Sequence, residues 1–453
     1  MIMERTSYNT SYIVGISFVS ALGGYLFGFD FAVISGALPF LQTQFGLDAY
    51  WEGFATGCLA LGAIAGCLVA GKVSDRYGRR RGLLLAAVLF GISALAMALS
   101  PNRNCLIVAR FMAGIGVGMA SMLSPMYIAE ISPAPLRGRM VAINQLTVVI
   151  GILLTNLVNY ALRNVGPEAW RWMFGLGVVP SALFFVGALW LPESPRWLVQ
   201  AGRAEAAGAI LERIGGAGFA RESIARILRS MHPSEDGLFV KKERTGYAAL
   251  LQKAVLPAVL VGIGLAVFQQ LCGINVVFNY TPRIFKSIGV TQEGGLLQTV
   301  FIGGVNLVFT LLAMVMVDRV GRKPLMLLGA GGLAVLYLVV VRMLSAGNPA
   351  VSWFLLGAIG VYALTLAPVT WVLISEVFPG KVRGAATSVA VLSLWAAYFV
   401  LVFTFPILFD RLGDATFYIY SAVCALGLVF VGWKVKETRG KTLEEIEDAI
   451  VRH

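Results

Sequence analysis

Long apolar stretches separated by short polar connections run along the chain from residue 11 to residue 433. A helix needs about 20 mostly apolar residues to cross a bilayer. The first stretch is longer than a signal peptide and leads directly into further spans, so we expect it to remain in the protein. The pattern predicts an all-α membrane protein with twelve transmembrane helices, at residues 11–40, 52–71, 82–99, 104–129, 138–161, 172–191, 254–282, 297–317, 324–344, 351–375, 385–409 and 415–433.

The composition supports this assignment and excludes several other classes of protein. Apolar residues make up 58% of the 453 residues and charged residues 13%, whereas soluble chains carry about 25% charged residues. Five unpaired cysteines and two histidines show no metal-ligand spacing and no nucleophile–base set, so we expect no enzyme activity, no cofactor and no metal. Gly114, Gly116 and Gly118 follow no strand, and we interpret them as helix-packing residues rather than a dinucleotide loop.

The net charge of +12 is explained by topology. If both termini lie on one side, that side holds 28 of the 36 Lys and Arg, including the basic linker 196–253. The positive-inside rule then predicts that both termini lie in the cytoplasm. We therefore expect a multi-pass protein of the cell inner membrane, with the lipid bilayer as its surroundings and no nucleic acid as a partner.

The second half of the chain repeats the first. Six predicted spans per repeat give both repeats the same orientation, which places a substrate site between the halves near the midplane, with rocking as the transport motion. Three patterns carry the repeat, at offsets of 243, 246 and 244 residues: Asp75 to Arg80 returns as Asp318 to Lys323, Glu130 with Arg137 returns as Glu376 with Arg383, and Glu193 returns as Glu437.

The predicted domains follow from this repeat. Residues 1–195 form the first six-helix half and residues 254–435 the second. Residues 196–253 contain apolar positions at helical spacing and are expected to form short cytoplasmic helices. Residues 436–453 form a cytoplasmic tail, with a helix start signal at Thr442.

Two charges lie inside the predicted spans. Asp30 belongs to the first window and Arg110 to the fourth, and both fall in the outer half of the membrane. A charge inside a span is costly and is by default a sign of function, so a proton relay is one interpretation. A static ion pair that only holds two helices together is the other.

The seventh window is rich in amides, with Gln269, Gln270, Asn275 and Asn279 in eleven residues. Gly273 and Pro282 allow the helix to break and to re-aim these side chains. Neutral amides suit a neutral polyol, because they donate and accept hydrogen bonds without demanding charge. The alternative is that they only join neighbouring helices.

With these motifs in their order along the chain, the sequence resembles the sugar porter family of the major facilitator superfamily, which includes bacterial sugar–proton symporters and glucose facilitators. The resemblance runs from about residue 23 to residue 437. It rests on the segments 75–80, 137–138, 192–196, 269–275 and 318–322.

This resemblance implies roles for individual residues. Asp30 would be the proton site and Arg110 its partner. The sugar would be bound by Gln145, Gln269, Gln270, Asn275, Asn306 and Trp371, in a cavity lined by Phe27, Ile152, Phe278 and Trp395. Gating ion pairs that latch the outward-open state would involve Asp75, Arg76, Arg79, Glu130, Arg137, Glu193, Asp318, Arg319, Glu376, Arg383 and Glu437.

The leading hypothesis is therefore a monomeric symporter of protons and a sugar that works by alternating access. Ile152 resembles the glucose-type members, which favours a hexose such as glucose. A proton-independent uniporter and a non-transporting sugar receptor stay as alternatives.

Overall fold

The computed structural model describes residues 8–231, 246–252, 255–378 and 382–439. The predicted tail helix at 442–450 lies outside these residues. Within them the fold is helical, without strands. Eleven described stretches are long and apolar enough to span a membrane, and one of them, Arg383–Lys434, contains two helices, α16 and α17. Every predicted window therefore has a helical counterpart, and the prediction of an all-α membrane fold is confirmed.

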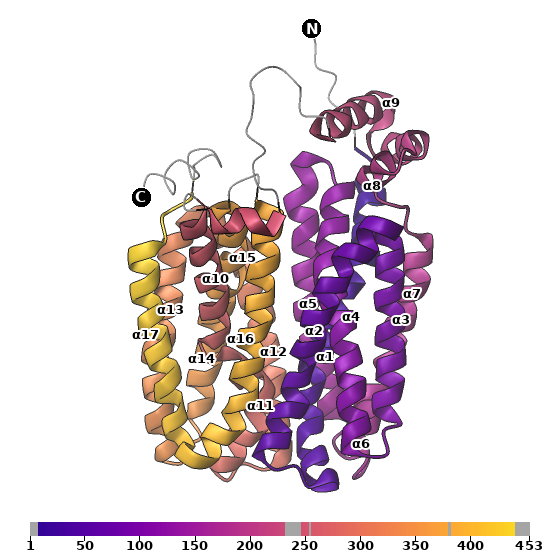
Figure 1. Ribbon diagram of the computed structural model, residues 1–453. Helices are drawn as coiled ribbons and strands as arrows, with labels where there is room; N and C mark the ends of the chain where they lie inside the picture. The colour runs from indigo at the N-terminus through magenta and orange to yellow at the C-terminus, as the bar shows by residue number, and fades with distance from the viewer. Residues whose placement is uncertain (1–7, 232–245, 253–254, 379–381, 440–453) are drawn as a thin grey trace.

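The helices form two bundles that stand side by side (Figure 1). The N-terminal bundle, called here the N half, contains α1 (Thr10–Phe45), α2 (Ala49–Tyr77), α3 (Arg79–Ala98), α4 (Arg103–Ile131), α5 (Ala134–Leu162), α6 (Ala169–Gly175) and α7 (Val178–Trp190). The C-terminal bundle, the C half, contains α10 (Leu256–Leu271), α11 (Ile274–Ser287), α12 (Gln292–Val320), α13 (Arg322–Ser345), α14 (Val351–Leu364), α15 (Leu366–Val377), α16 (Arg383–Leu412), η2 (Gly413–Ala415) and α17 (Thr416–Lys434).

Three helical elements lie between the two bundles in the sequence. They are α8 (Pro195–Gln200), α9 (Ala204–Met231) and η1 (Gly246–Leu251). In Figure 1, α8 and α9 lie beyond one end of the N half, at the end of the molecule where α1 begins and α17 ends. We call this the linker end, and we call the end that carries α6 and the end of α11 the opposite end.

Local sequence explains where helices begin and how closely they pack. The N-cap side chains of Asp48, Asn102 and Thr291 each accept a hydrogen bond from a backbone N–H of the first turn, as helix starts require. Between α2 and α4, a Cβ on Gly114 or Gly118 would lie 2.1 Å from a carbonyl oxygen of α2. Backbones this close need glycine, so the interpretation of these residues as packing positions is confirmed.

The predicted break in the seventh span is present. Its two parts, α10 and α11, meet at Gly273, whose φ of +89° lies in the left-handed region that favours glycine. A Cβ there would also lie 2.6 Å from the ring of Tyr420. Because of the break, the amides before and after Gly273 do not have to point in the directions that one continuous helix would impose.

Candidate functional site

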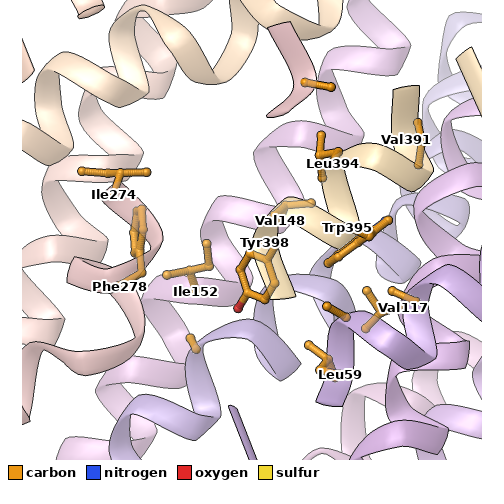
Figure 2. Close-up of a cluster of buried hydrophobic side chains, with 14 of the residues drawn as sticks. Leu59, Val117, Val148, Ile152, Ile274, Phe278, Val391, Leu394, Trp395 and Tyr398 are labelled. Carbon is orange, nitrogen blue, oxygen red and sulfur yellow. The ribbon is translucent and has the colours of Figure 1, made fainter. Parts of the chain in front are cut away.

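Apolar and aromatic side chains from both halves come together in one region of the molecule. In Figure 2, Ile152 of α5 and Tyr398 of α16 lie between Phe278 of α11 and Trp395 of α16, and the rings of Trp395 and Tyr398 are 5.8 Å apart. The ring of Phe27 on α1 lies 5.7 Å from that of Trp395. The four residues predicted to line a sugar cavity therefore come from α1, α5, α11 and α16; Ile152, Phe278 and Trp395 are buried, and Phe27 is partly buried and packs against the same core.

The amides of α10 and α11 form a hydrogen-bonded row beside this cluster. Gln270 Nε2 donates to Gln269 Oε1 over 2.7 Å, and Asn275 Nδ2 donates to Gln270 Oε1 over 2.5 Å. Asn279 Nδ2 donates to the hydroxyl of Tyr398, 3.1 Å away. These side chains are buried. The break at Gly273 thus aligns the amides of two helices into one polar strip, with donor and acceptor capacity left for hydroxyl groups.

The other predicted sugar-binding residues are more dispersed. Asn306 is buried on α12, whereas Gln145 on α5 and Trp371 on α15 are exposed. In the described chain no hydrogen bond joins these three side chains to the amide row. The structure therefore groups Gln269, Gln270 and Asn275 tightly and leaves the other three on separate helices.

Asp30 and Arg110 are both buried, on the neighbouring helices α1 and α4. Arg110 Nε donates to the carbonyl oxygen of Ala55 over 2.7 Å. Its two terminal nitrogens have no hydrogen-bond partner among the described residues, and no direct ion pair to Asp30 forms there. Arg110 is close enough to Asp30 to act on its charge, but the two side chains are not in contact.

A network of ion pairs and hydrogen bonds lies at the linker end of the N half. Arg79 donates to both carboxylate oxygens of Glu130 over 3.0 Å and approaches Asp75 at 3.4 Å. Ser194 donates a short hydrogen bond to Glu130. Glu193 accepts hydrogen bonds from the backbone N–H groups of Arg79 and of the next residue, so it caps the start of α3.

The C half repeats this network. Arg322 pairs with Glu376 at 3.3 Å, and Thr438 Oγ1 donates to Glu376 over 2.6 Å. Glu437 caps the start of α13 as Glu193 caps α3. Burial alone would raise the pKa of Glu437, but backbone N–H groups, including that of Arg322, bond its ionised form and hold the pKa below its usual value.

Both networks lie within single halves. Among the predicted gating residues, Arg76 and Arg319 are exposed, Arg137 and Arg383 donate to backbone carbonyls of their own half, and the side chain of Asp318 lies outside the described ones. In this state they therefore do not latch one half to the other. Arg322, which the sequence analysis did not select, is the counterpart of Arg79 at the repeat offset of 243 residues, and that offset was the signal that could have found it.

Contacts between the halves occur toward the opposite end. Asn156 Nδ2 of α5 donates to the carbonyl oxygen of Thr299 on α12 over 2.8 Å. Arg163, at the end of α5, forms an ion pair of 2.6 Å with Glu293 in the first turn of α12. The molecule is thus tied across the halves at the opposite end, while the described ion pairs at the linker end stay within each half.

Comparison with known proteins places this architecture in a family. The family described as Sugar (and other) transporter matches residues 16–450. The chain belongs to this family of membrane transporters. The resemblance noted in the sequence is therefore confirmed.

Relatives of known name match almost the whole chain. The D-xylose-proton symporter of Escherichia coli is 37% identical and the glucose transport protein of Synechocystis 38% identical. The arabinose-proton symporter of Bacillus subtilis is 36% identical. These alignments cover 97% or 98% of this chain and 96% to 98% of the relatives.

Solved structures of one of these relatives have the same fold as this chain, and two of them are an inward-open form and a sugar-bound form. The inward-open conformation of the E. coli xylose transporter superposes with a TM-score of 0.85 at 35% identity, covering 97% of this chain and 100% of that one. The same symporter bound to 6-bromo-6-deoxy-D-glucose superposes with a TM-score of 0.80 at 36% identity, covering 98% and 100%.

Proposed function

We propose that this protein is a sugar–proton symporter that works by alternating access and takes a hexose such as glucose. The observation that carries the proposal is the buried row of neutral amides on α10 and α11 of the C half, beside aromatic and apolar side chains, together with a buried carboxylate, Asp30, on α1 of the N half. Relatives named as symporters of xylose and arabinose, and one named as a glucose transport protein, support the class of substrate. Ile152 and the glucose relative favour a hexose.

The amide row would hold the sugar. Its donors and acceptors can exchange partners with sugar hydroxyls, and the rings of Phe278 and Trp395 offer apolar faces for the carbon skeleton. Uncharged groups suit a neutral ligand, because they leave no unpaired charge behind when the sugar departs.

Asp30 would carry the proton. When Arg110 is close, it favours the ionised carboxylate; when the pair is separated, burial favours the protonated form. The separation in this structure supports a cycle in which the proton bound to Asp30 crosses with the sugar and is then released to water. Arg110 would return to the carboxylate after release and reset the site.

Orientation follows from charge. The linker end carries most of the basic residues, so we assign it and both termini to the cytoplasm and the opposite end to the outside. The protein would lie in the cell inner membrane and act as a monomer, with residues 1–195 and 254–435 as its rocking halves.

Reconstitution in liposomes tests this proposal. Uptake of a panel of labelled hexoses and pentoses is measured with and without an inward proton gradient. We expect one hexose to accumulate against its own gradient only when the proton gradient is imposed. Accumulation of pentoses alone would show that the substrate is a pentose and not a hexose. Equilibration of the sugar at the same rate with and without the proton gradient would indicate a uniporter. Binding of the sugar without uptake would indicate a receptor.

A further inference from the structure

Three charged side chains meet at the opposite end, on the seam between the halves. Glu52 lies in the first turn of α2 in the N half, whereas Arg283 of α11 and Asp410 of α16 belong to the C half. The guanidinium of Arg283 contacts both carboxylates, with one terminal nitrogen on each. Arg283 therefore joins the two halves through Glu52 and stays anchored to its own half through Asp410.

Burial differs strongly within this cluster. The side chain of Glu52 is 1% exposed, that of Arg283 18% and that of Asp410 54%. A carboxylate taken out of water is stable only when a partner compensates its charge. Among the described ion pairs, that partner for Glu52 is Arg283. The closed arrangement at this end therefore depends on a contact that crosses the seam.

Close packing surrounds the cluster. A Cβ on Gly53, next to Glu52, would lie 2.3 Å from the carbonyl oxygen of Phe403 on α16. The ring of Tyr50 lies 5.3 Å from that of Phe403, and the ring of Phe54 lies 6.4 Å from it. Backbone contact and aromatic rings thus shield Glu52 from water, which strengthens its charge interaction with Arg283.

We propose that Glu52, Arg283 and Asp410 form the gate that seals the sugar cavity at the opposite end. This inference rests on the proposed alternating access. When the halves rock apart at this end, Arg283 stays with Asp410 and water hydrates Glu52 in its place. The gate can therefore open without leaving Glu52 buried and unpaired. When water is excluded between the halves, the Glu52–Arg283 pair favours the closed state.

Distances between spin labels across the seam test the gate. The five native cysteines are replaced by serine, and labels are attached to cysteines introduced at Thr43 on α1 and Ser287 on α11, both exposed positions at the opposite end. The measurement is made on the full chain in lipid without sugar. In Arg283→Gln we expect the ratio of long-distance to short-distance populations to rise by at least about tenfold, because a buried pair has lost its partner.

Further variants separate a gate from a general loss of packing. Glu52→Gln should shift the populations in the same direction, and the double variant should shift them no further than the larger single change, since both remove one contact. Arg283→Lys keeps the charge and should stay close to the unsubstituted chain. The matched control is Arg226→Gln, which removes an exposed ion pair within α9 and should change nothing.

The outcomes are decisive for the gate. Unchanged distance distributions in both Glu52→Gln and Arg283→Gln would overturn it, as would additive shifts in the double variant. Because no sugar is present, a failure of the proposed function appears elsewhere, as absent sugar binding and uptake by the unsubstituted chain. Monodisperse elution of every variant shows that the distances come from folded protein.

Discussion

The two ends of the molecule use charge in different ways. At the linker end, Arg79 with Glu130 and Arg322 with Glu376 form ion pairs that each stay within one half. At the opposite end, Arg163 with Glu293 and Arg283 with Glu52 form ion pairs that cross between the halves. The same residue types therefore stabilise a rigid body at one end and a contact between rigid bodies at the other.

This difference bears on how the proposed transport motion would work. A transporter that alternates its access must break contacts at one end while it makes them at the other. Among the described side chains, the ion pairs that cross between the halves are made at the opposite end. The repeated linker-end networks would then keep each half intact while the halves move.

The largest effect is expected at Asp30, between the two ends. Asp30→Asn mimics a permanently protonated carboxylate, so it should abolish proton-driven sugar accumulation while exchange of labelled for unlabelled sugar continues. Uptake and exchange are measured in parallel in liposomes under an imposed pH difference. Concentrative uptake at the unsubstituted rate would remove Asp30 from the proton path and favour the uniporter.

The second largest effect is expected on the stability of the halves, when an ion pair at the linker end is removed. Arg79→Gln should lower the stability of the N half by about 1.5–3 kcal/mol, because its charged hydrogen bonds to Glu130 are lost. Arg322→Gln should cost less, since the Arg322–Glu376 pair is more exposed, at 14% and 21% against 7% and 10%. Thermal unfolding in detergent ranks the two variants. The reverse ranking would show that burial does not decide the difference.

A moderate effect is expected in the amide row. Gln270→Ala and Asn275→Ala each remove hydrogen-bond partners for sugar hydroxyls and should weaken binding roughly 2–13-fold. Calorimetry with the transported sugar measures the affinity. The control is Asn159→Ala, which removes an amide that bonds within the N half, to the carbonyl oxygen of Ala32, outside the amide row. Affinity that stays constant in both amide variants would mean that the row only joins helices.

The smallest effect is expected from the exposed pair at the opposite end. Glu293 is 57% exposed, so Arg163→Gln should shift the balance between open and closed states only about 1.4–5-fold. The label pair at Thr43 and Ser287 reports this balance. A shift as large as that of Arg283→Gln would place the gate at α5 and α12 instead.

Much of the architecture could be predicted from the chain. Windows of apolar residues predicted the spans, because lipid requires every backbone polar group to be satisfied inside a helix. The repeat predicted equivalent positions in the two halves, and Glu130 and Glu376 each accept hydrogen bonds from an arginine and from a hydroxyl side chain at equivalent positions. Gly273 marked the helix break because its freedom at positive φ is a property of the residue itself.

The pairing of charges across the seam could not be predicted in this way. The gate consists of residues far apart in the sequence: Glu52 belongs to the N half, and Arg283 and Asp410 belong to the C half. In the sequence each resembles an ordinary charge at the end of a span. Whether Asp30 touches Arg110 could not be predicted either, because it depends on how α1 and α4 pack. Residue type and local spacing thus determined the helices, the repeat and the candidate amides of this protein. Only the tertiary structure decided which charges meet, because ion pairs act over a few ångströms and depend on how whole helices pack.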